Sequence, residues 1–167
     1  MALFTTPIKT LDDLFLHTIK DMYHAEHQIT KALPKMIEKA RDSELKQTLM
    51  HHLEETKVHV TRLDQVFRHL GEEPEGVTCE AIKGTIEEAK QVMSDIGDPE
   101  VLDAGIIGSA QTVEHYEISR YGTLIALARR LDHAGVVPLL RATLDEEKNA
   151  DAVLTRVAES AVNVKAA

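Results

Sequence analysis

The chain has 167 residues, enough for one domain with a sizeable apolar core. Its formal net charge of −9 argues against binding to nucleic-acid phosphates or anionic membrane surfaces, and an aromatic content of 4% with no Trp argues against stacking on bases. Cys79 is the single cysteine, so no internal disulfide can form, and no apolar run reaches transmembrane length. We therefore expect a cytoplasmic protein with no nucleic-acid partner and no membrane partner.

The first long helix is predicted over residues 11–41. Residues 1–9 form a short tail, and Thr10 with Asp13 resembles a capping box that opens the helix. Pro34 should kink the helix or make a local break, because proline lacks an N–H group and crowds the preceding turn.

A second long helix is predicted over residues 44–70, where Gly71 ends it. The connection that follows, residues 71–97, starts with a loop rich in Gly and Pro and carries a shorter helix over about residues 79–96. A connection of this length can return the chain across a bundle.

The last third of the chain predicts two more long helices. Asp98-Pro99 reads as an N-cap with proline in the first turn, opening a helix over residues 98–131. The last helix covers about residues 136–162. Short turns join the first helix to the second and the third to the fourth, so each pair is antiparallel. We expect one all-α domain over residues 1–167, a ferritin-like antiparallel four-helix bundle whose long crossover carries an extra short helix.

The predicted helix 98–131 carries two acidic residues on its inward face. Its inward positions, at steps of three and four, are Ile107, Ala110, Glu114, Glu117, Tyr121, Leu124, Ala128 and Leu131. No Lys or Arg lies on this stripe to neutralise Glu114 and Glu117. Because burying an unpaired charge costs several kcal/mol, either the stripe is misplaced or a cation comes from elsewhere.

The other long helices place similar groups near the same height, which makes a constellation of candidate metal ligands. The candidates are Glu26, Glu55, His59, Glu114, Glu117, Glu147 and Asp151. Ionised carboxylates that face each other repel strongly, and two divalent cations would remove the repulsion. A ligand set rich in oxygen suits iron or manganese better than a structural zinc site. We therefore predict two iron ions, or two manganese ions, per chain.

The spacing differs from that of known di-metal bundles, which use a Glu from two helices and Glu-x-x-His from the other two. On the second and fourth helices the paired candidates are four residues apart, although positions four apart still share a helix face. The sequence leaves open which residues bridge the metals. It also leaves open whether Glu54 and Glu146 point inward in place of Glu55 and Glu147.

Several segments carry a resemblance to a known family. They are Asp21-Met-Tyr-His-Ala-Glu26, Leu33-Pro-Lys-Met36, His52-Leu-Glu-Glu-Thr56, Val113-Glu-His-Tyr-Glu-Ile118 and Glu146-Glu-Lys148. At these segments the chain resembles the YciE/YciF-type stress-protein family of the ferritin-like superfamily. The resemblance implies a ferritin-like bundle with an extra crossover helix, a homodimer, and a di-metal centre related to that of rubrerythrins.

Two functions fit these observations. The first is a ferritin-like di-metal carboxylate protein of the bacterial stress response, which would oxidise Fe(II) or scavenge peroxide or O₂ if it is catalytic. Since the chain has no Cys-x-x-Cys pair, its electrons would come from an external donor. The second is a non-catalytic dimeric bundle that acts as a scaffold or partner-binding module.

Overall fold

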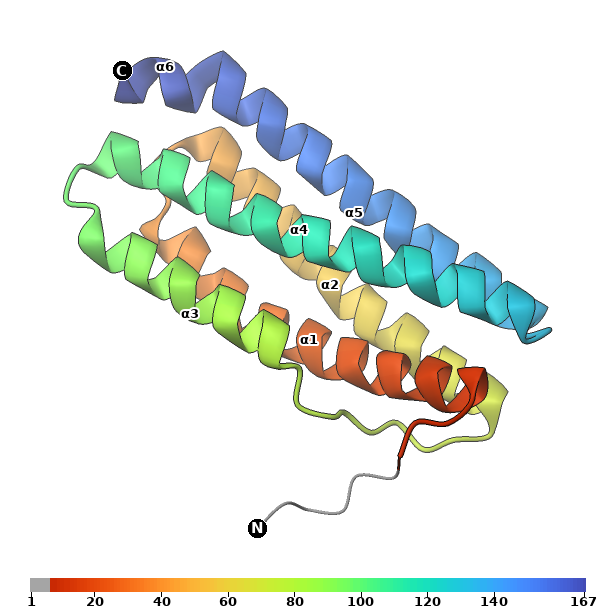
Figure 1. Ribbon diagram of the computed structural model, residues 1–167. Coiled ribbons are helices and arrows are strands. Elements are labelled where there is room, and N and C mark those ends of the chain that lie inside the picture. Colours follow the sequence, from red (N-terminus) through yellow and green to blue (C-terminus); the bar gives the residue numbers. More distant parts are fainter. Residues whose placement is uncertain (1–6) are drawn as a thin grey trace, which may run out of the picture.

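The computed structural model describes residues 7–167, which contain helices, turns and loops and no strand. The long helices of the bundle are α1 (Leu11–Lys39), α2 (Ser43–Leu70), α4 (Pro99–Arg130) and α5 (Val137–Val157). The connection from α2 to α4 carries α3 (Glu80–Asp95) (Figure 1). The remaining elements are short: η1 (Ala134–Val136), the π-helical turn η2 (Ala158–Val162) and α6 (Asn163–Ala166).

The direction of the helices follows from the lengths of their connections. Short turns make α1 antiparallel to α2 and α4 antiparallel to α5, and the long crossover lets α4 run in the same direction as α2. α1 and α5 therefore run one way along the bundle and α2 and α4 the other way (Figure 1). The segment from α2 to α4 returns the chain along the bundle, and α3 packs against α4 and α1 on the way. This confirms the predicted ferritin-like arrangement with a single crossover.

The helix ends confirm most of the capping predictions. Thr10 and Asp13 form a complete capping box at the start of α1. Asp98 accepts hydrogen bonds from two backbone N–H groups in the first turn of α4. Gly71 ends α2 with a φ of 73°, a left-handed conformation that favours glycine. α1 is continuous across Pro34, so the structure shows no local break there.

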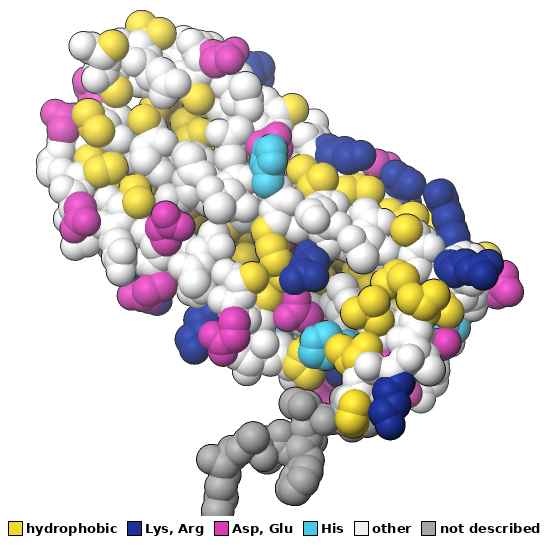
Figure 2. Space-filling model, viewed as in Figure 1, with side chains coloured by type: hydrophobic (Ala, Val, Ile, Leu, Met, Phe, Trp, Pro, Cys, Tyr) yellow, Lys and Arg dark blue, Asp and Glu magenta, His cyan; other side chains and the backbone are white. Residues whose placement is uncertain are grey.

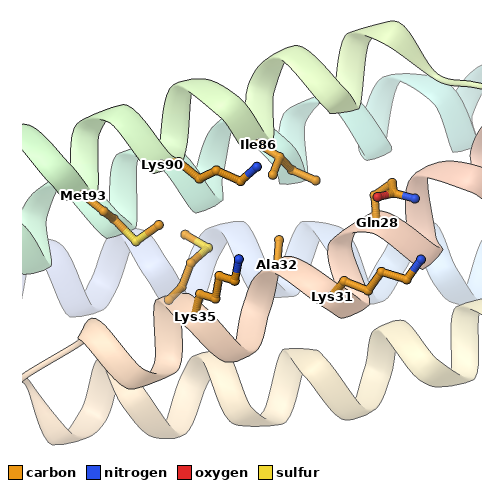
Figure 3. Close-up of a pocket in the computed structure, with 8 residues that line it drawn as sticks. Gln28, Lys31, Ala32, Lys35, Ile86, Lys90 and Met93 are labelled. Atoms are coloured by element: carbon orange, nitrogen blue, oxygen red, sulfur yellow. The ribbon is translucent and has the colours of Figure 1, made fainter.

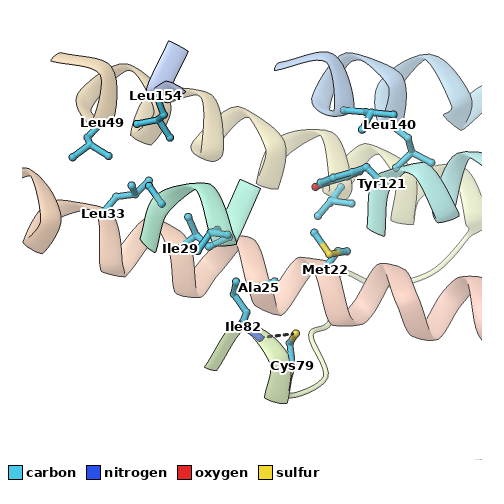
Figure 4. Packing of buried hydrophobic residues seen from close by; sticks show 14 of the residues in the cluster. Met22, Ala25, Ile29, Leu33, Leu49, Cys79, Ile82, Tyr121, Leu140 and Leu154 are labelled. Carbon is cyan, nitrogen blue, oxygen red and sulfur yellow. Dashed lines mark hydrogen bonds between the residues drawn. The ribbon is translucent and has the colours of Figure 1, made fainter. Parts of the chain in front are cut away.

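A capping contact that the sequence did not suggest fixes the start of α3. The backbone N–H of Ile82 donates to Cys79 Sγ over 3.5 Å (Figure 4). Two other contacts of Cys79 tie the crossover helix to the bundle: its backbone N–H donates to His24 Nδ1 of α1 at 3.2 Å, and its Sγ lies 2.9 Å from the Tyr116 hydroxyl of α4.

The core is a continuous apolar cluster to which each long helix contributes (Figure 4). Side chains labelled there include Met22, Ile29 and Leu33 of α1, Leu49 of α2, Tyr121 of α4, and Leu140 and Leu154 of α5. Each fully buried apolar side chain of this size contributes about 1.5–3 kcal/mol to folding. The cluster holds the helix axes in place and so fixes where the polar side chains on their inner faces meet.

The surface is mixed in charge. On the face shown in Figure 2, acidic and basic side chains are interspersed, and basic ones follow the edge over α5. Across residues 7–167, none of the helices has the length and apolar character needed to cross a membrane.

A buried carboxylate on α4 ties down the turn between α1 and α2. Asp103 Oδ1 accepts from the backbone N–H of Arg41 at 2.8 Å, and its Oδ2 accepts from the backbone N–H of Asp42 at 2.7 Å. Hydrogen bonds to an ionised group are stronger than those between neutral groups. Asp103 therefore joins the two halves of the chain at one end of the bundle.

We predict that Asp103→Ala lowers the free energy of unfolding by about 2–4 kcal/mol, because both N–H groups lose a charged acceptor in a partly buried turn. Urea unfolding in a metal chelator measures this. Asp145→Ala, at an exposed position on α5, is the control and should change stability by less than about 0.5 kcal/mol. Equal effects of the two substitutions would contradict this role for Asp103.

Candidate metal centre

Six potential metal ligands are buried inside the bundle, and all of its long helices contribute. They are Glu26 of α1, His52 and His59 of α2, Glu114 and Glu117 of α4, and Glu147 of α5. None of them is more than 4% exposed. Each lies on the inward face of its helix, in line with other buried residues three or four positions away.

The ligand atoms form two overlapping groups. In one group His52 lies with Glu114, Glu117 and Glu147, and in the other Glu26 lies with His59 and Glu147; within each group the atoms are within 4.8 Å of one another. His52 Nε2 is 3.2 Å from Glu114 Oε1, and His59 Nδ1 is 2.9 Å from Glu147 Oε1. Glu147 belongs to both groups and so occupies the position between them.

These six residues also hold unpaired polar atoms. Among the described residues, every buried side-chain N or O atom without a hydrogen-bond partner belongs to one of the six. Both oxygens of Glu117, Oε2 of Glu147 and both ring nitrogens of His52 are in this state, whereas Glu147 Oε1 lies within hydrogen-bonding distance of His59 Nδ1 when that nitrogen carries a proton. Folded proteins pair nearly all buried polar atoms, and an unpaired one costs about 1–3 kcal/mol. Lone pairs concentrated at one place fit a divalent cation as their common partner.

A contact outside the two groups fixes the ring of His59. Its Nε2 lies 2.8 Å from Glu146 Oε2, and Arg62 donates two hydrogen bonds to the same carboxylate. These bonds from Arg62 hold the pKa of Glu146 below its usual value, so Glu146 is ionised and accepts the Nε2–H of His59. The other ring nitrogen, Nδ1, therefore faces Glu26 and Glu147. Metal-binding histidines are commonly oriented in this way.

Tyr121 fixes Glu26 in the same manner. The buried Tyr121 hydroxyl donates a hydrogen bond to Glu26 Oε1. Glu26 Oε2 has no hydrogen-bond partner and lies 3.6 Å from His59 Nδ1. One oxygen of Glu26 is thus used for positioning while the other faces the second ligand group.

Burial and mutual repulsion shift the pKa values of the acids and of His59 in the centre. Burial, followed by the nearby charge of Glu147, raises the pKa of Glu117 well above its usual value, and burial raises that of Glu114 in the same direction. Burial lowers the pKa of His59, but the charge of Glu26 and the contact with Glu147 outweigh it and raise this pKa to about 11. Protons therefore supply the compensating charge that divalent cations would supply, and metal binding would displace them.

Comparisons with known proteins agree with this architecture. A family model described as a domain of unknown function, DUF892, matches residues 10–167. Protein YciF of Escherichia coli strain K12 is 42% identical over 160 residues, which are 95% of this chain and 96% of that protein. The chain belongs to the family of YciF-type stress proteins.

Solved structures of relatives have the same fold. The crystal structure of the E. coli stress protein YciF superposes with a TM-score of 0.89 at 42% identity, over 93% of this chain and 99% of that one. YcfI from Rhodopseudomonas palustris, described as a proposed structural protein, gives a TM-score of 0.89 at 54% identity over 92% and 98% of the two chains. A Xanthomonas campestris protein at 19% identity and a TM-score of 0.75, covering 93% of this chain and 95% of its own, shows the same fold.

The structure of this YciF-type chain brings five of the predicted ligands together and leaves two outside the ligand groups. Glu55 and Asp151 are half-buried at the edge of the site. Asp151 Oδ1 accepts from Gln111 Nε2 at 2.9 Å, and Oδ2 lies 3.3 Å from Nε2 of the exposed His115. The inward face of α5 runs from Glu147 through Ala150 to Leu154, which places Asp151 beside that face. Metal binding by Glu55 and Asp151 stays a prediction.

His52 is a member of the buried group that the sequence-based ligand set omitted. The buried row of α2 is Leu45, Leu49, His52, Thr56, His59 and Leu63. Its steps of four and three are regular, and this regularity is the signal that could have selected His52. The alternative glutamates point elsewhere: Glu54 is exposed and pairs with Lys57 at 2.6 Å, and Glu146 binds Arg62 and His59.

We predict that Glu117→Gln stabilises the metal-free protein at pH 7. Because its folded-state pKa is raised, folded Glu117 keeps a proton that the unfolded chain releases above its usual pKa of 4.5. Wild-type stability therefore falls as pH rises from 4.5 to 7, and glutamine removes this loss. Urea unfolding in chelator at pH 4.5 and pH 7 measures the difference in stability between Glu117→Gln and the wild type. This difference should be smaller at pH 4.5 than at pH 7.

The exposed Glu54→Gln substitution is the control for this comparison and should leave the pH dependence unchanged. A metal-free Glu117→Gln protein that is less stable than the wild type at pH 7 would show that the carboxylate is satisfied without a cation.

Proposed function

We propose that the protein is a ferritin-like di-metal carboxylate protein of the bacterial stress response, with two iron or manganese ions per chain. One observation carries the proposal: the residues that form the two ligand groups are the same residues that hold the unpaired buried atoms. A structural bundle gains nothing from such a set, because apolar side chains of similar volume would avoid the cost of burying it.

The arrangement of ligands supports two ions rather than one. His52, Glu114 and Glu117 would hold one ion and Glu26 and His59 the other, and Glu147, which belongs to both groups, would be available to either. Carboxylate oxygens outnumber imidazole nitrogens, and such oxygen-rich sites suit iron and manganese. Bridging carboxylates on facing helices are the usual way in which bundles hold two metals.

The reaction that fits such a centre is oxidation of Fe(II) by O₂ or peroxide, or the scavenging of peroxide. The metals would supply the redox chemistry. The residues of the chain hold the geometry: Tyr121 fixes Glu26, Glu146 fixes His59, and the apolar core excludes bulk water. Turnover would require an external electron donor, and the functional unit would be a cytoplasmic homodimer. Oxygen and peroxide consumption by Fe(II)-loaded protein tests the reaction.

The second candidate function is a non-catalytic scaffold. Its support is that the R. palustris relative is described as a proposed structural protein. In a scaffold, protons on Glu114, Glu117 and His59 would compensate the buried charge permanently. Metal-dependent stability separates the two functions, because a cation that binds only the folded state must stabilise it.

We predict that Mn(II), or Fe(II) without oxygen, stabilises the wild-type protein by about 2.7 kcal/mol at a concentration one hundred times its Kd. For a chain of this length the corresponding rise in Tm is about 5–10 °C. Glu147→Gln should lose most of this rise, because Glu147 belongs to both ligand groups. Scanning calorimetry with and without metal measures the shift.

Glu54→Gln is the matched control on the exposed face of α2 and should keep the full rise in Tm. Wild-type protein with the same Tm in chelator and in metal would contradict the proposed function and favour the scaffold.

A further inference from the structure

A hollow between α2 and α5 leads to the metal centre. Its volume is about 340 Å³, and its lining residues include Glu44, His51, His52, Glu55 and Arg156. His52 lies at the inner end, because it belongs both to this lining and to the first ligand group. The other lining residues named here lie outside both ligand groups.

The polar groups along the hollow form a graded series from solvent to the centre. His51 Nε2 lies 3.7 Å from Glu55 Oε1, Glu55 Oε2 lies 3.8 Å from His52 Nδ1, and His52 Nε2 lies 3.2 Å from Glu114 Oε1. Side-chain exposure falls along the series from 72% to 19%, 5% and 2%. Imidazole and carboxylate alternate, and both are cation ligands.

His52 connects the outer and inner parts of this series. Its ring is buried, and neither ring nitrogen has a hydrogen-bond partner. Nδ1 faces Glu55 and the hollow, whereas Nε2 faces Glu114 and the centre. An unpaired nitrogen aimed outward from a buried ring is placed to bind a cation before it reaches the centre.

The charge on the hollow favours cations at Glu55 in particular. Arg156 is the basic side chain in the lining, and it donates a hydrogen bond to Glu44 over 2.6 Å. The charges of Arg156 and Glu44 therefore cancel at the outer edge of the hollow. Among residues 7–167, the ion-pair contacts of Glu55 are with His51 and His52 at 3.7 and 3.8 Å, and the nearby Arg62 donates its hydrogen bonds to Glu146 instead, so Glu55 can attract a cation into the hollow.

On the opposite side of the bundle, a second hollow is lined by basic rather than acidic side chains. A hollow of about 130 Å³ between α1 and α3 is lined by Lys31, Lys35 and Lys90, and none of its lining residues is acidic. Figure 3 shows Lys35 of α1 and Lys90 of α3 on the two sides of this hollow. Lys90 also pairs with Glu87 outside the lining. Three ammonium groups at one opening repel a divalent cation.

A small apolar cavity separates these lysines from the centre. It measures about 20 Å³ and shares Ala32, Met36 and Ile86 with the lysine-lined hollow, and it also touches His52 and Glu114. A hydrated cation does not cross an apolar passage of this size, because the cost of removing its water is not repaid there. Of the two approaches, the one between α2 and α5 fits a cation.

We propose that His51, Glu55 and His52 form a transit site through which a divalent cation enters the metal centre from the hollow between α2 and α5. The inference rests on the proposed function, because transit needs a destination. It gives Glu55 a role at the edge of the centre, where its carboxylate, between His51 and His52, would bind the incoming cation in place of some of its water.

The test is the rate at which metal-free protein takes up Co(II), followed by visible absorbance in a stopped-flow instrument. At low ionic strength, Glu55→Gln should slow uptake by about tenfold, and His51→Ala should slow it in the same direction. Added salt should slow the wild type more than Glu55→Gln. The Co(II) content at saturation should equal that of the wild type in both variants.

Lys35→Gln, on the opposite side, is the control and should leave the uptake rate unchanged or raise it slightly. Circular dichroism and Tm in chelator confirm that each variant is folded; Glu55→Gln keeps the shape of the side chain, and His51 is exposed.

Three results would overturn the transit site while leaving the metal centre intact. In the first, both variants take up Co(II) at the wild-type rate. In the second, Glu55→Gln binds one ion fewer at saturation. In the third, Lys35→Gln slows uptake as much as Glu55→Gln does. Loss of an ion would make Glu55 a permanent ligand. Wild-type protein that retains no Co(II) would instead defeat the proposed function, and the transit site with it.

Discussion

The cost of keeping carboxylates away from water is the constraint on which this structure depends. Glu26, Glu114, Glu117 and Glu147 lie in an interior where an isolated ionised carboxylate would cost many kcal/mol. The helices pack through a continuous apolar cluster, which keeps these groups away from bulk water in the folded chain. The charge must therefore be compensated where it lies, by protons or by cations.

The surroundings of the centre are arranged for cations. Tyr121 holds one oxygen of Glu26, and Glu146 with Arg62 holds one nitrogen of His59, so that the free atom of each residue faces the centre. These contacts fix the orientation of Glu26 and His59 as well as their protonation. Metal sites commonly use such surrounding hydrogen bonds to orient their ligands.

The fold could be predicted almost fully from the sequence, because its signals are local. Thr10, Asp98 and Gly71 mark helix ends through contacts within one turn, and the long stripes of apolar residues mark the inward faces. Glu114 and Glu117 could be placed for the same reason, since they lie in the middle of such a stripe and the structure buries both.

The edge of the centre could not be predicted in this way. From Glu147 a step of three leads to Ala150 and a step of four to Asp151, and both steps keep to one helix face. On α2, His52 and Glu55 lie on neighbouring rows for the same reason. The choice between such rows depends on how far each helix is rotated about its axis, and packing against the other helices sets that rotation. The contact of His59 with Glu146 joins α2 to α5, so no local pattern indicates it.

Metal content is the most direct test of the account. Wild-type protein and Glu114→Ala would be loaded with Fe(II) without oxygen, desalted, and measured by elemental mass spectrometry against protein concentration. The account predicts close to two irons per chain in the wild type and a clear loss in the variant, since Glu114 lies in one of the two ligand groups. No retained metal in the wild type would contradict it, and the buried acids would then be compensated by protons alone.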